Sequence, residues 1–259
     1  MTRAILLFFL CGCVAAKAQI RVGKLVIKPH ETFVLDSTDI LVADSLIMLD
    51  SSNIRLNNLK TQNFIRARVA VFGKNCRIDG RGIGGVKGTN GTSGLTPIGP
   101  CRDGIDGRNG MRGLSGGAGV NLFLYIDEIR LNGRLIINLS GGNGGDGGDG
   151  GHGGGGGPGT RQCRGGDGGK GGDGGAGGDG GRGGTLTVGG NDVAATKTLI
   201  GTVLLIRNGG GSFGYGGSAG AGGAAGLGPI RNHGTDGHNG VDGSYGHPGE
   251  RGTVLFEEP

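Results

Sequence analysis

The chain has 259 residues, of which 68 are glycine and only 7 are proline. Collagen combines glycine near one residue in three with roughly 15–20 % proline, so the composition argues against a collagen triple helix. The formal net charge is +5 at pH 7, from 26 basic and 21 acidic residues. Without Arg3 and Lys17 of the N-terminal segment it is only +3, which gives little support to non-specific nucleic-acid binding.

Residues 1–18 are expected to be a signal peptide. The apolar run AILLFFL is followed by Ala16-Lys17-Ala18, an A-x-A cleavage site that would leave Gln19 as the first mature residue. We therefore expect an exported protein of the periplasm, the outer-membrane surface or the medium. Lipoprotein processing is an alternative, because Leu10-Cys11-Gly12-Cys13 resembles a lipobox that would place a lipid on Cys13.

Residues 19–81 contain short runs in which apolar and polar residues alternate, a pattern typical of β-strands. Further runs return at 120–140, 185–210 and 253–259, among them NLFLYIDEIRL, TLTV, TLIGTVLLIRN and TVLFEE. Three strands enter a glycine-rich segment in the same way, which indicates an internal repeat of roughly 60 to 70 residues. The fold class expected is mostly β with a right-handed parallel β-helix-like base, and a β-sandwich base is the alternative.

Glycine recurs at every third position in three paired segments, 82–119, 141–184 and 211–252. A period of three fits neither an α-helix nor a β-strand, but it is the period of an extended helix of the polyproline II kind. We therefore expect three polyglycine II hairpins that form a six-arm bundle. A disordered glycine-rich linker is the alternative, although such linkers lack a regular phase.

The glycine content of each arm predicts how many of its three faces are buried. Most arms of the first and third pairs read Gly-X-X, whereas both arms of the second pair read Gly-Gly-X. A glycine face lets a neighbouring backbone approach and pair through its N–H and C=O groups. The second hairpin should therefore lie between the first and the third. One non-glycine column of this hairpin is expected to face solvent and to keep the rod soluble: Asp167, Lys170, Asp173, Ala176, Asp179 and Arg182.

Three cysteines follow the signal segment. Cys101 and Cys163 lie in the turns of the first and second glycine hairpins, which should meet at the same distal end. In an oxidising compartment we expect them to form a disulfide that stabilises the fold by at most about 4 kcal/mol. Cys76 lies in a predicted strand and is expected to be a buried thiol.

The hairpin turns are candidate binding surfaces at the end of a rod roughly 40–60 Å long, at 3.1 Å per residue. They read LTPIGPCR, GPGTRQCR and GLGPIRN, so arginine and isoleucine recur in them. The arginine fork suits phosphate and carboxylate groups, but these arginines could equally serve only to solubilise the turns. The candidate residues are Arg102, Arg161, Arg164 and Arg231, with Asp103 as the nearest carboxylate, together with Ile98 and Ile230.

No catalytic triad or carboxylate pair is recognisable, so we expect no enzymatic activity and no cofactor. The stretch GGNGGDGGD partly matches a calcium-binding nonapeptide, but Gly148 stands where a large apolar residue is needed. Successive positions on one face of a three-residue helix are about 9 Å apart, too far for two side chains to hold one ion easily, which argues against a metal site built from the histidines of the third hairpin. They are His233, His238 and His247, with Asp236 and Asp242 nearby.

The repeats GGDGGHGG and GGDGGKGGDGG resemble two polyglycine II bundles, the snow flea antifreeze protein and the tip domain of phage long-tail-fibre adhesins. The resemblance covers about 110 residues in the six arms. The adhesin resemblance implies recognition by the turns, and the antifreeze resemblance implies ice binding by a flat face of small side chains. Only 211–226 offers such a face, with Ser218, Ala219, Ala221, Ala224 and Ala225.

These observations favour a non-catalytic exported envelope or surface protein: a structural scaffold, an adhesin-like binding module, or a subunit of a larger assembly. Its expected partners are other envelope proteins or an anionic surface glycan, with no specific nucleic acid. Membrane contact is expected only if the chain is lipidated or held in a complex. The alternatives are an ice-binding protein and a β-helical carbohydrate-active protein.

Overall fold

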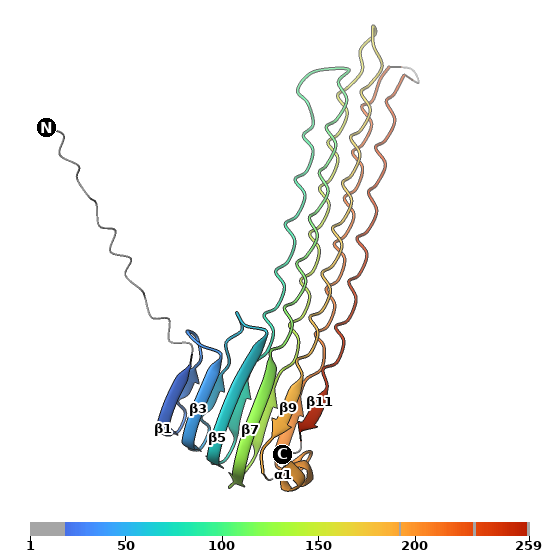
Figure 1. Ribbon diagram of the computed structural model, residues 1–259. Coiled ribbons are helices and arrows are strands. Elements are labelled where there is room, and N and C mark those ends of the chain that lie inside the picture. Colours follow the sequence, from blue (N-terminus) through green and yellow to red (C-terminus); the bar gives the residue numbers. More distant parts are fainter. Residues whose placement is uncertain (1–18, 192, 230–231, 258–259) are drawn as a thin grey trace, which may run out of the picture.

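The computed structural model describes residues 19–191, 193–229 and 232–257, so the expected signal peptide, Cys13, Ile230 and Arg231 lie outside the described residues. Two parallel sheets form one end of the molecule, and the strand-rich class expected from the sequence is confirmed (Figure 1). The larger sheet has the order β1-β3-β5-β7-β9-β11 and the smaller one β10-β8-β6-β4-β2. Every pairing between the described strands is parallel.

The chain alternates between the two sheets, so each pair of consecutive strands lies beside the preceding pair. The larger sheet contains β1 (Ile20–Ile27), β3 (Ile40–Met48), β5 (Gln62–Phe72), β7 (Asn121–Leu131), β9 (Leu186–Gly189) and β11 (Val254–Glu257). The smaller sheet contains β2 (Thr32–Val34), β4 (Asn53–Arg55), β6 (Cys76–Asp79), β8 (Leu135–Asn138) and β10 (Leu204–Arg207). We call the two sheets together the base.

The core of the base consists of aliphatic side chains in register. In the larger sheet Leu41, Ile65, Leu124 and Val188 are successive register partners, and all four are buried. In the smaller sheet the corresponding column is Ile54, Ile78, Ile137 and Ile206. Because each new strand pair repeats the inward aliphatic positions of the last, the core grows as a continuous stack, driven by burial of apolar area.

One segment differs from the sequence expectation. The run TLIGTVLLIRN was interpreted as a strand, but its first residues complete the helix α1 (Val193–Leu199), and β10 begins only at Leu204. The helix includes Ala194 and Ala195, which have the highest helix propensity, and it buries Val193 and Thr196. This part of the strand prediction was wrong.

Three long excursions leave the base, between β6 and β7, between β8 and β9, and between β10 and β11. They run side by side as six extended segments (Figure 1). We number them in chain order and call them together the rod. Arms 1 to 6 are 82–94, 104–119, 141–157, 165–184, 211–226 and 234–252.

Backbone hydrogen bonds at every third residue join the arms. Gly142 N–H donates to Gly117 O at 2.8 Å, and the same pattern continues every three residues along arms 3 and 2. Arms 3 and 4 are each bonded to four other arms, whereas arms 1 and 6 are each bonded to two. The arms therefore form two staggered rows, arms 1, 3 and 5 beside arms 2, 4 and 6. The second hairpin lies between the first and the third, as predicted.

The glycine columns are where neighbouring backbones come closest. A Cβ atom built on Gly148 would collide with the carbonyl group of Thr89, and one on Gly175 would collide with that of Met111. Comparable collisions occur at nearly every third residue of all six arms. Both glycine columns of arms 3 and 4 are buried or half-buried, in agreement with their Gly-Gly-X repeats. Glycine is required here for the approach of two backbones rather than for conformational freedom.

Replacing Gly148 by alanine should destabilise the chain by about 1–3 kcal/mol, since the methyl group must push two arms apart. Gly209→Ala is the matched control, because nothing lies within 4 Å of the Cβ that it would add. The measurement is the denaturant midpoint of unfolding for both variants. Equal midpoints for the two would contradict the close-approach role of the glycine columns.

Candidate functional site

The distal end of the rod is held by a disulfide between the first two hairpin turns. Cys101 and Cys163 form this bond with a Cα–Cα distance of 6.0 Å, which confirms the predicted pairing. Cys101 N–H also donates to Pro158 O at 2.9 Å, and Gly157 N–H donates to Arg102 O at 2.7 Å. The two turns thus form one rigid surface.

The predicted tip arginines differ in their surroundings. Arg102 and Arg161 are exposed, and neither guanidinium makes a hydrogen bond or ion pair to the residues that the structure describes. Arg164 instead pairs with Asp167 at 2.6 Å. Asp103, which was expected to be the nearest carboxylate, accepts the backbone N–H of Asp167 at 2.7 Å.

The hairpin turns also expose apolar side chains. Ile98 is 95 % exposed in the first turn, and Leu227 is 75 % exposed where arm 5 ends. Gly159 N–H donates to Leu227 O at 2.8 Å, so the second and third turns are also joined. The described part of the tip therefore combines free cationic groups with uncovered apolar surface, a combination found at binding surfaces.

Polar side chains along the arms have a structural role that the sequence analysis missed. The column Asp167, Asp173 and Asp179 was expected only to keep the rod soluble. Their carboxylates instead accept backbone N–H groups of arm 6 at 2.7–2.9 Å, from Thr235, Val241 and His247. Asn and Asp side chains brace other pairs of arms in the same way, among them Asn90, Asp106, Asn109, Asn143, Asp146 and Asp242.

These hydrogen bonds change the acidity of two carboxyls. The backbone N–H of Thr235, followed by its hydroxyl, lowers the pKa of Asp167 below the ordinary value of 3.8. The backbone N–H of His247 lowers the pKa of Asp179 in the same sense. A carboxylate that accepts N–H donors is favoured over the neutral acid, so both groups stay charged at neutral pH.

Two histidines of the rod serve as hydrogen-bond acceptors. His152 Nδ1 accepts the N–H of Ala221 at 2.9 Å, and His233 Nδ1 accepts the N–H of Gly228 at 3.0 Å. Among the described residues, no three His, Cys, Asp or Glu side chains are grouped so that they could hold a metal ion. His152 and His233 thus belong to the same bracing system as the Asn and Asp side chains.

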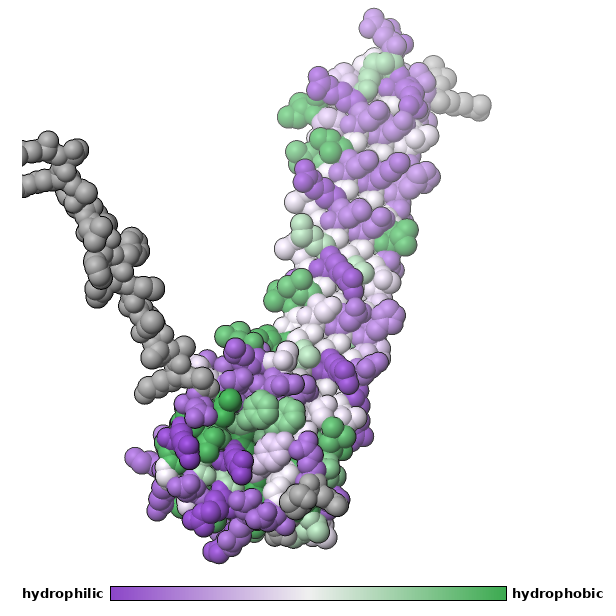
Figure 2. Space-filling model, in the orientation of Figure 1, coloured by the Kyte–Doolittle hydropathy of each residue, from purple (hydrophilic) through white to green (hydrophobic). Residues whose placement is uncertain are grey.

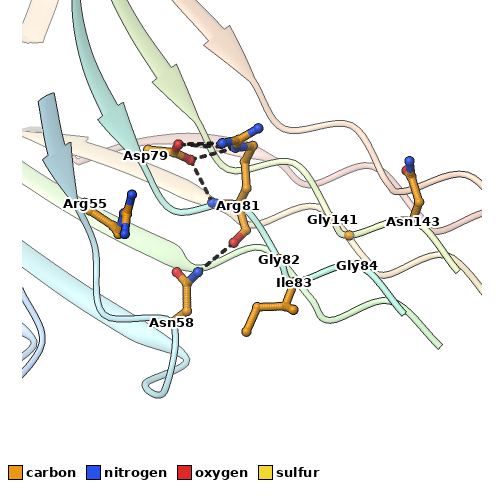
Figure 3. Close-up of a pocket in the computed structure, with 10 residues that line it drawn as sticks. Arg55, Asn58, Asp79, Arg81, Gly82, Ile83, Gly84, Gly141 and Asn143 are labelled. Carbon is orange, nitrogen blue, oxygen red and sulfur yellow. Dashed lines mark hydrogen bonds and ion pairs between the residues drawn. The ribbon is translucent and has the colours of Figure 1, made fainter. Parts of the chain in front are cut away.

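A cleft lies where the rod meets the base (Figure 3). This cleft has a volume of about 520 Å³ and is lined by Arg55, Asn58, Asp79, Arg81 and glycine backbone of arms 1 and 3. Arg81 is held by Asp79 at 2.9 Å, and Asn58 donates to Arg81 O at 2.9 Å. Asp79, Arg81 and Asn58 of the lining thus pair with one another at the point where arm 1 leaves the base.

The small-residue face of arm 5 lies beside charged residues. Ser218, Ala221 and Ala224 are exposed in one column. The N–H groups of the first two are accepted by Asp149 and His152 of arm 3, which lie alongside. The face is therefore chemically mixed rather than uniformly small.

Two further features bear on the environment of the chain. Cys76 is free and buried, as predicted, with its Sγ 3.3 Å from Leu49 O. In the ranges that the structure describes, no helix has both the length and the apolar character needed to cross a bilayer.

The base and rod define a parallel β protein that carries glycine-rich arms. Comparison of the chain with family models, curated proteins and solved structures finds no significant match to any of them.

Removing the disulfide in a Cys101→Ser/Cys163→Ser variant should lower the free energy of unfolding, by at most about 4 kcal/mol. The loss of hydrogen-exchange protection should be largest at Cys101 and Gly157 and small in the strands of the base, because the bond ties the turns. Cys76→Ala is the control and should keep the sensitivity to reductant. A uniform loss of protection across rod and base would contradict a clamp at the tip.

Acid should weaken the attachment of arm 6 to arm 4. Asp167 and Asp179 have lowered pKa values in the folded chain, so their stabilisation is complete above 3.8 and is lost as pH falls through those lower values. The amide protection factors of Thr235 and His247 should therefore decrease as the pH is taken below 3.8. An Asp167→Asn/Asp179→Asn variant keeps an acceptor oxygen and should lack this pH dependence; the same acid response in both chains would refute the assignment.

Proposed function

We propose that the base is a right-handed parallel β-helix and that its last three coils each extend into a polyglycine II hairpin. The parallel pairing of all described strands supports the base assignment over a β-sandwich, since sandwiches are built from antiparallel sheets. The hydrogen bonds between arms and the burial of residues along each arm both repeat every three residues, which supports the polyglycine II assignment of the arms. On this proposal the six arms form one layered bundle of the kind that the sequence resembles.

We propose that the protein is an exported, non-catalytic binding module or scaffold whose rod presents its distal end to an anionic glycan at a cell surface. The observation that carries this proposal is the tip: the guanidinium groups of Arg102 and Arg161 pair with none of the described residues, and the joined turns that carry them also expose Ile98. Arginine can grip carboxylate or sulfate groups through two parallel hydrogen bonds. The disulfide between neighbouring turns supports a rigid binding surface.

Export of the chain is part of the same proposal. A disulfide is retained in an oxidising compartment and is rare where thiols are kept reduced. The A-x-A site before Gln19 provides the corresponding signal in the sequence.

The proposal is tested with acidic polysaccharide immobilised on a sensor, using polygalacturonate and dextran sulfate as probes and neutral dextran as the blank. Replacing the four tip arginines by glutamine should weaken binding by about fourfold or more, since exposed charge pairs contribute about 0.2–1 kcal/mol each. The substituted residues are Arg102, Arg161, Arg164 and Arg231.

The matched control removes the same charge from the base, in Arg21, Arg66, Arg68 and Arg134, all of which are exposed. Its binding should remain close to that of the unchanged chain. If base and tip variants weaken binding equally, the tip has no special role. If the unchanged chain binds neither acidic probe, the proposed ligand class is wrong.

A further inference from the structure

One edge of the rod carries a stripe of apolar side chains. Arms 1 and 2 form this edge, and six large apolar side chains along it, including Leu95 directly after arm 1, are exposed. Val86 is 65 % exposed and Leu114 is 62 % exposed, for example. The residues of this edge stripe are Ile83, Val86, Leu95, Ile105, Met111 and Leu114.

Hydrogen bonds fix how the two columns of the edge stripe face each other. Leu114 N–H donates to Val86 O at 2.9 Å, and Ile105 N–H donates to Leu95 O at 3.1 Å. Thr89, Thr92 and Arg108 fill the positions between these pairs. Apolar side chains therefore recur along the edge from the base toward the tip, and Figure 2 shows such groups along one side of the rod.

The architecture of the arms does not require apolar residues on this edge. Every third residue of arm 6 from Thr235 to Glu250 is also exposed, yet Val241 is the single large apolar residue among these six positions. Polar side chains at such positions keep an arm soluble. Exposed apolar surface that is concentrated on one edge marks an interaction site.

The base extends beyond this edge and forms a shelf. The segments after β2 and β4 are short turns, at 35–39 and 56–61, and no arm rises from them. In Figure 1, β1 and β3 accordingly lie outside the first hairpin. Leu59 on the second turn is 88 % exposed, and with Ile83 it lines a cleft of about 380 Å³ at the corner of shelf and rod. Shelf and edge stripe thus form an L-shaped surface.

The edge stripe is nearly symmetric about its midpoint. Read from base to tip, arm 1 has Ile83 and Val86, then two threonines, then Leu95, with Ile98 beyond it in the turn. On arm 2, Leu114 and Ile105 lie at the two ends with Met111 and Arg108 between them. A two-fold rotation that reverses the direction of the rod places the apolar residues of one stripe opposite apolar residues of the other. The same rotation places Arg108 opposite Met111 rather than opposite a second arginine.

We propose that this surface pairs with the same surface of a second copy of the chain, as an antiparallel dimer with two-fold symmetry. Val86 contacts the partner's Leu95, and Leu114 contacts the partner's Ile105. The aliphatic stem of Arg108 covers the partner's Met111, a use of arginine that leaves its charged group in water. Ile98 of each copy lies over the partner's shelf, so both L-shaped surfaces are covered in the dimer.

Such a dimer is isologous, because each contact occurs twice. The edge stripe is about 40 Å long at 3.1 Å per residue. With the shelf included, the pair buries on the order of 1,000 Å², which is at the lower limit for a specific interface. We therefore expect a dimer with a dissociation constant in the micromolar range.

The dimer does not depend on the proposed glycan binding. It directs the two tips in opposite directions and leaves Arg161 and Arg164 outside the paired edges. If the tip does bind a surface, the dimer joins two such surfaces.

Sedimentation velocity over a concentration series tests the association. The unchanged chain should be dimeric at high concentration, and a Val86→Lys/Leu114→Lys variant should be monomeric. In dilute solution, where both chains are monomers, their melting temperatures should be equal, because both side chains point into solvent in the monomer. Val241→Lys, at a position that is 70 % exposed on arm 6, is the matched control and should still dimerise. A chain that stays monomeric up to about 0.1 mM overturns the proposal.

A pair of cysteines tests the antiparallel arrangement. In a Val86→Cys/Leu95→Cys variant the two thiols of one chain lie about 28 Å apart, nine residues at 3.1 Å each, and cannot bond to each other. Mild oxidation should yield a covalent dimer, whereas Val86→Cys alone should give none. Equal crosslinking by both variants, or by neither while the chain still dimerises, refutes the arrangement.

Discussion

The rod depends on one close approach, in which the carbonyl group of one arm lies against the α-carbon of a glycine in the next. Without a Cβ atom in the way, N–H and C=O groups of neighbouring arms bond at 2.7–3.1 Å. Ordering an extended glycine chain costs about 1–2 kcal/mol per residue, and the arms bury almost no large side chains. Their order therefore rests on repeated hydrogen bonds between arms and on the base. Arms 3 and 4, with four neighbours each, need two glycine columns, and the Gly-Gly-X repeat supplies them.

The same constraint determines what the polar residues do. An arm with period three points some of its N–H groups away from any carbonyl, and such groups need another acceptor. Asp167, Asp179 and Asn143 supply one, and so does His152 through its ring nitrogen. Most Asn and Asp side chains along the arms are thus part of the framework. The Arg102 guanidinium, which pairs with none of the described residues, and the edge stripe are not part of this framework.

The features that were predictable from the sequence are those set by backbone spacing. Counting glycine columns predicts that the second hairpin lies between the others, and placing Cys101 and Cys163 in neighbouring turns predicts their disulfide. The contacts that could not be predicted are those that depend on which backbone N–H group a given side chain reaches. The period places Asp167 and Asp173 in one column, but the neighbouring arm beside that column is known only after folding. Arg164 was expected to be free for the same reason, although its partner is only three residues away. The helix α1 was not predicted because its last two residues, Thr198 and Leu199, also fit a strand pattern.

The base positions all of these surfaces. Its strands are spaced about 4.8 Å apart, and three successive strand pairs each send out two arms, so the stacking of the base sets how the arms line up. The first two strand pairs send out none, which leaves arms 1 and 2 with an open side above a shelf. A rod whose hairpins leave the smaller sheet and return to the larger one, and which is tied at the tip by a disulfide, has little conformational freedom to lose on binding. Modest surfaces such as the tip and the edge stripe then retain more of their contact energy as affinity, because the ordering cost has been met in folding.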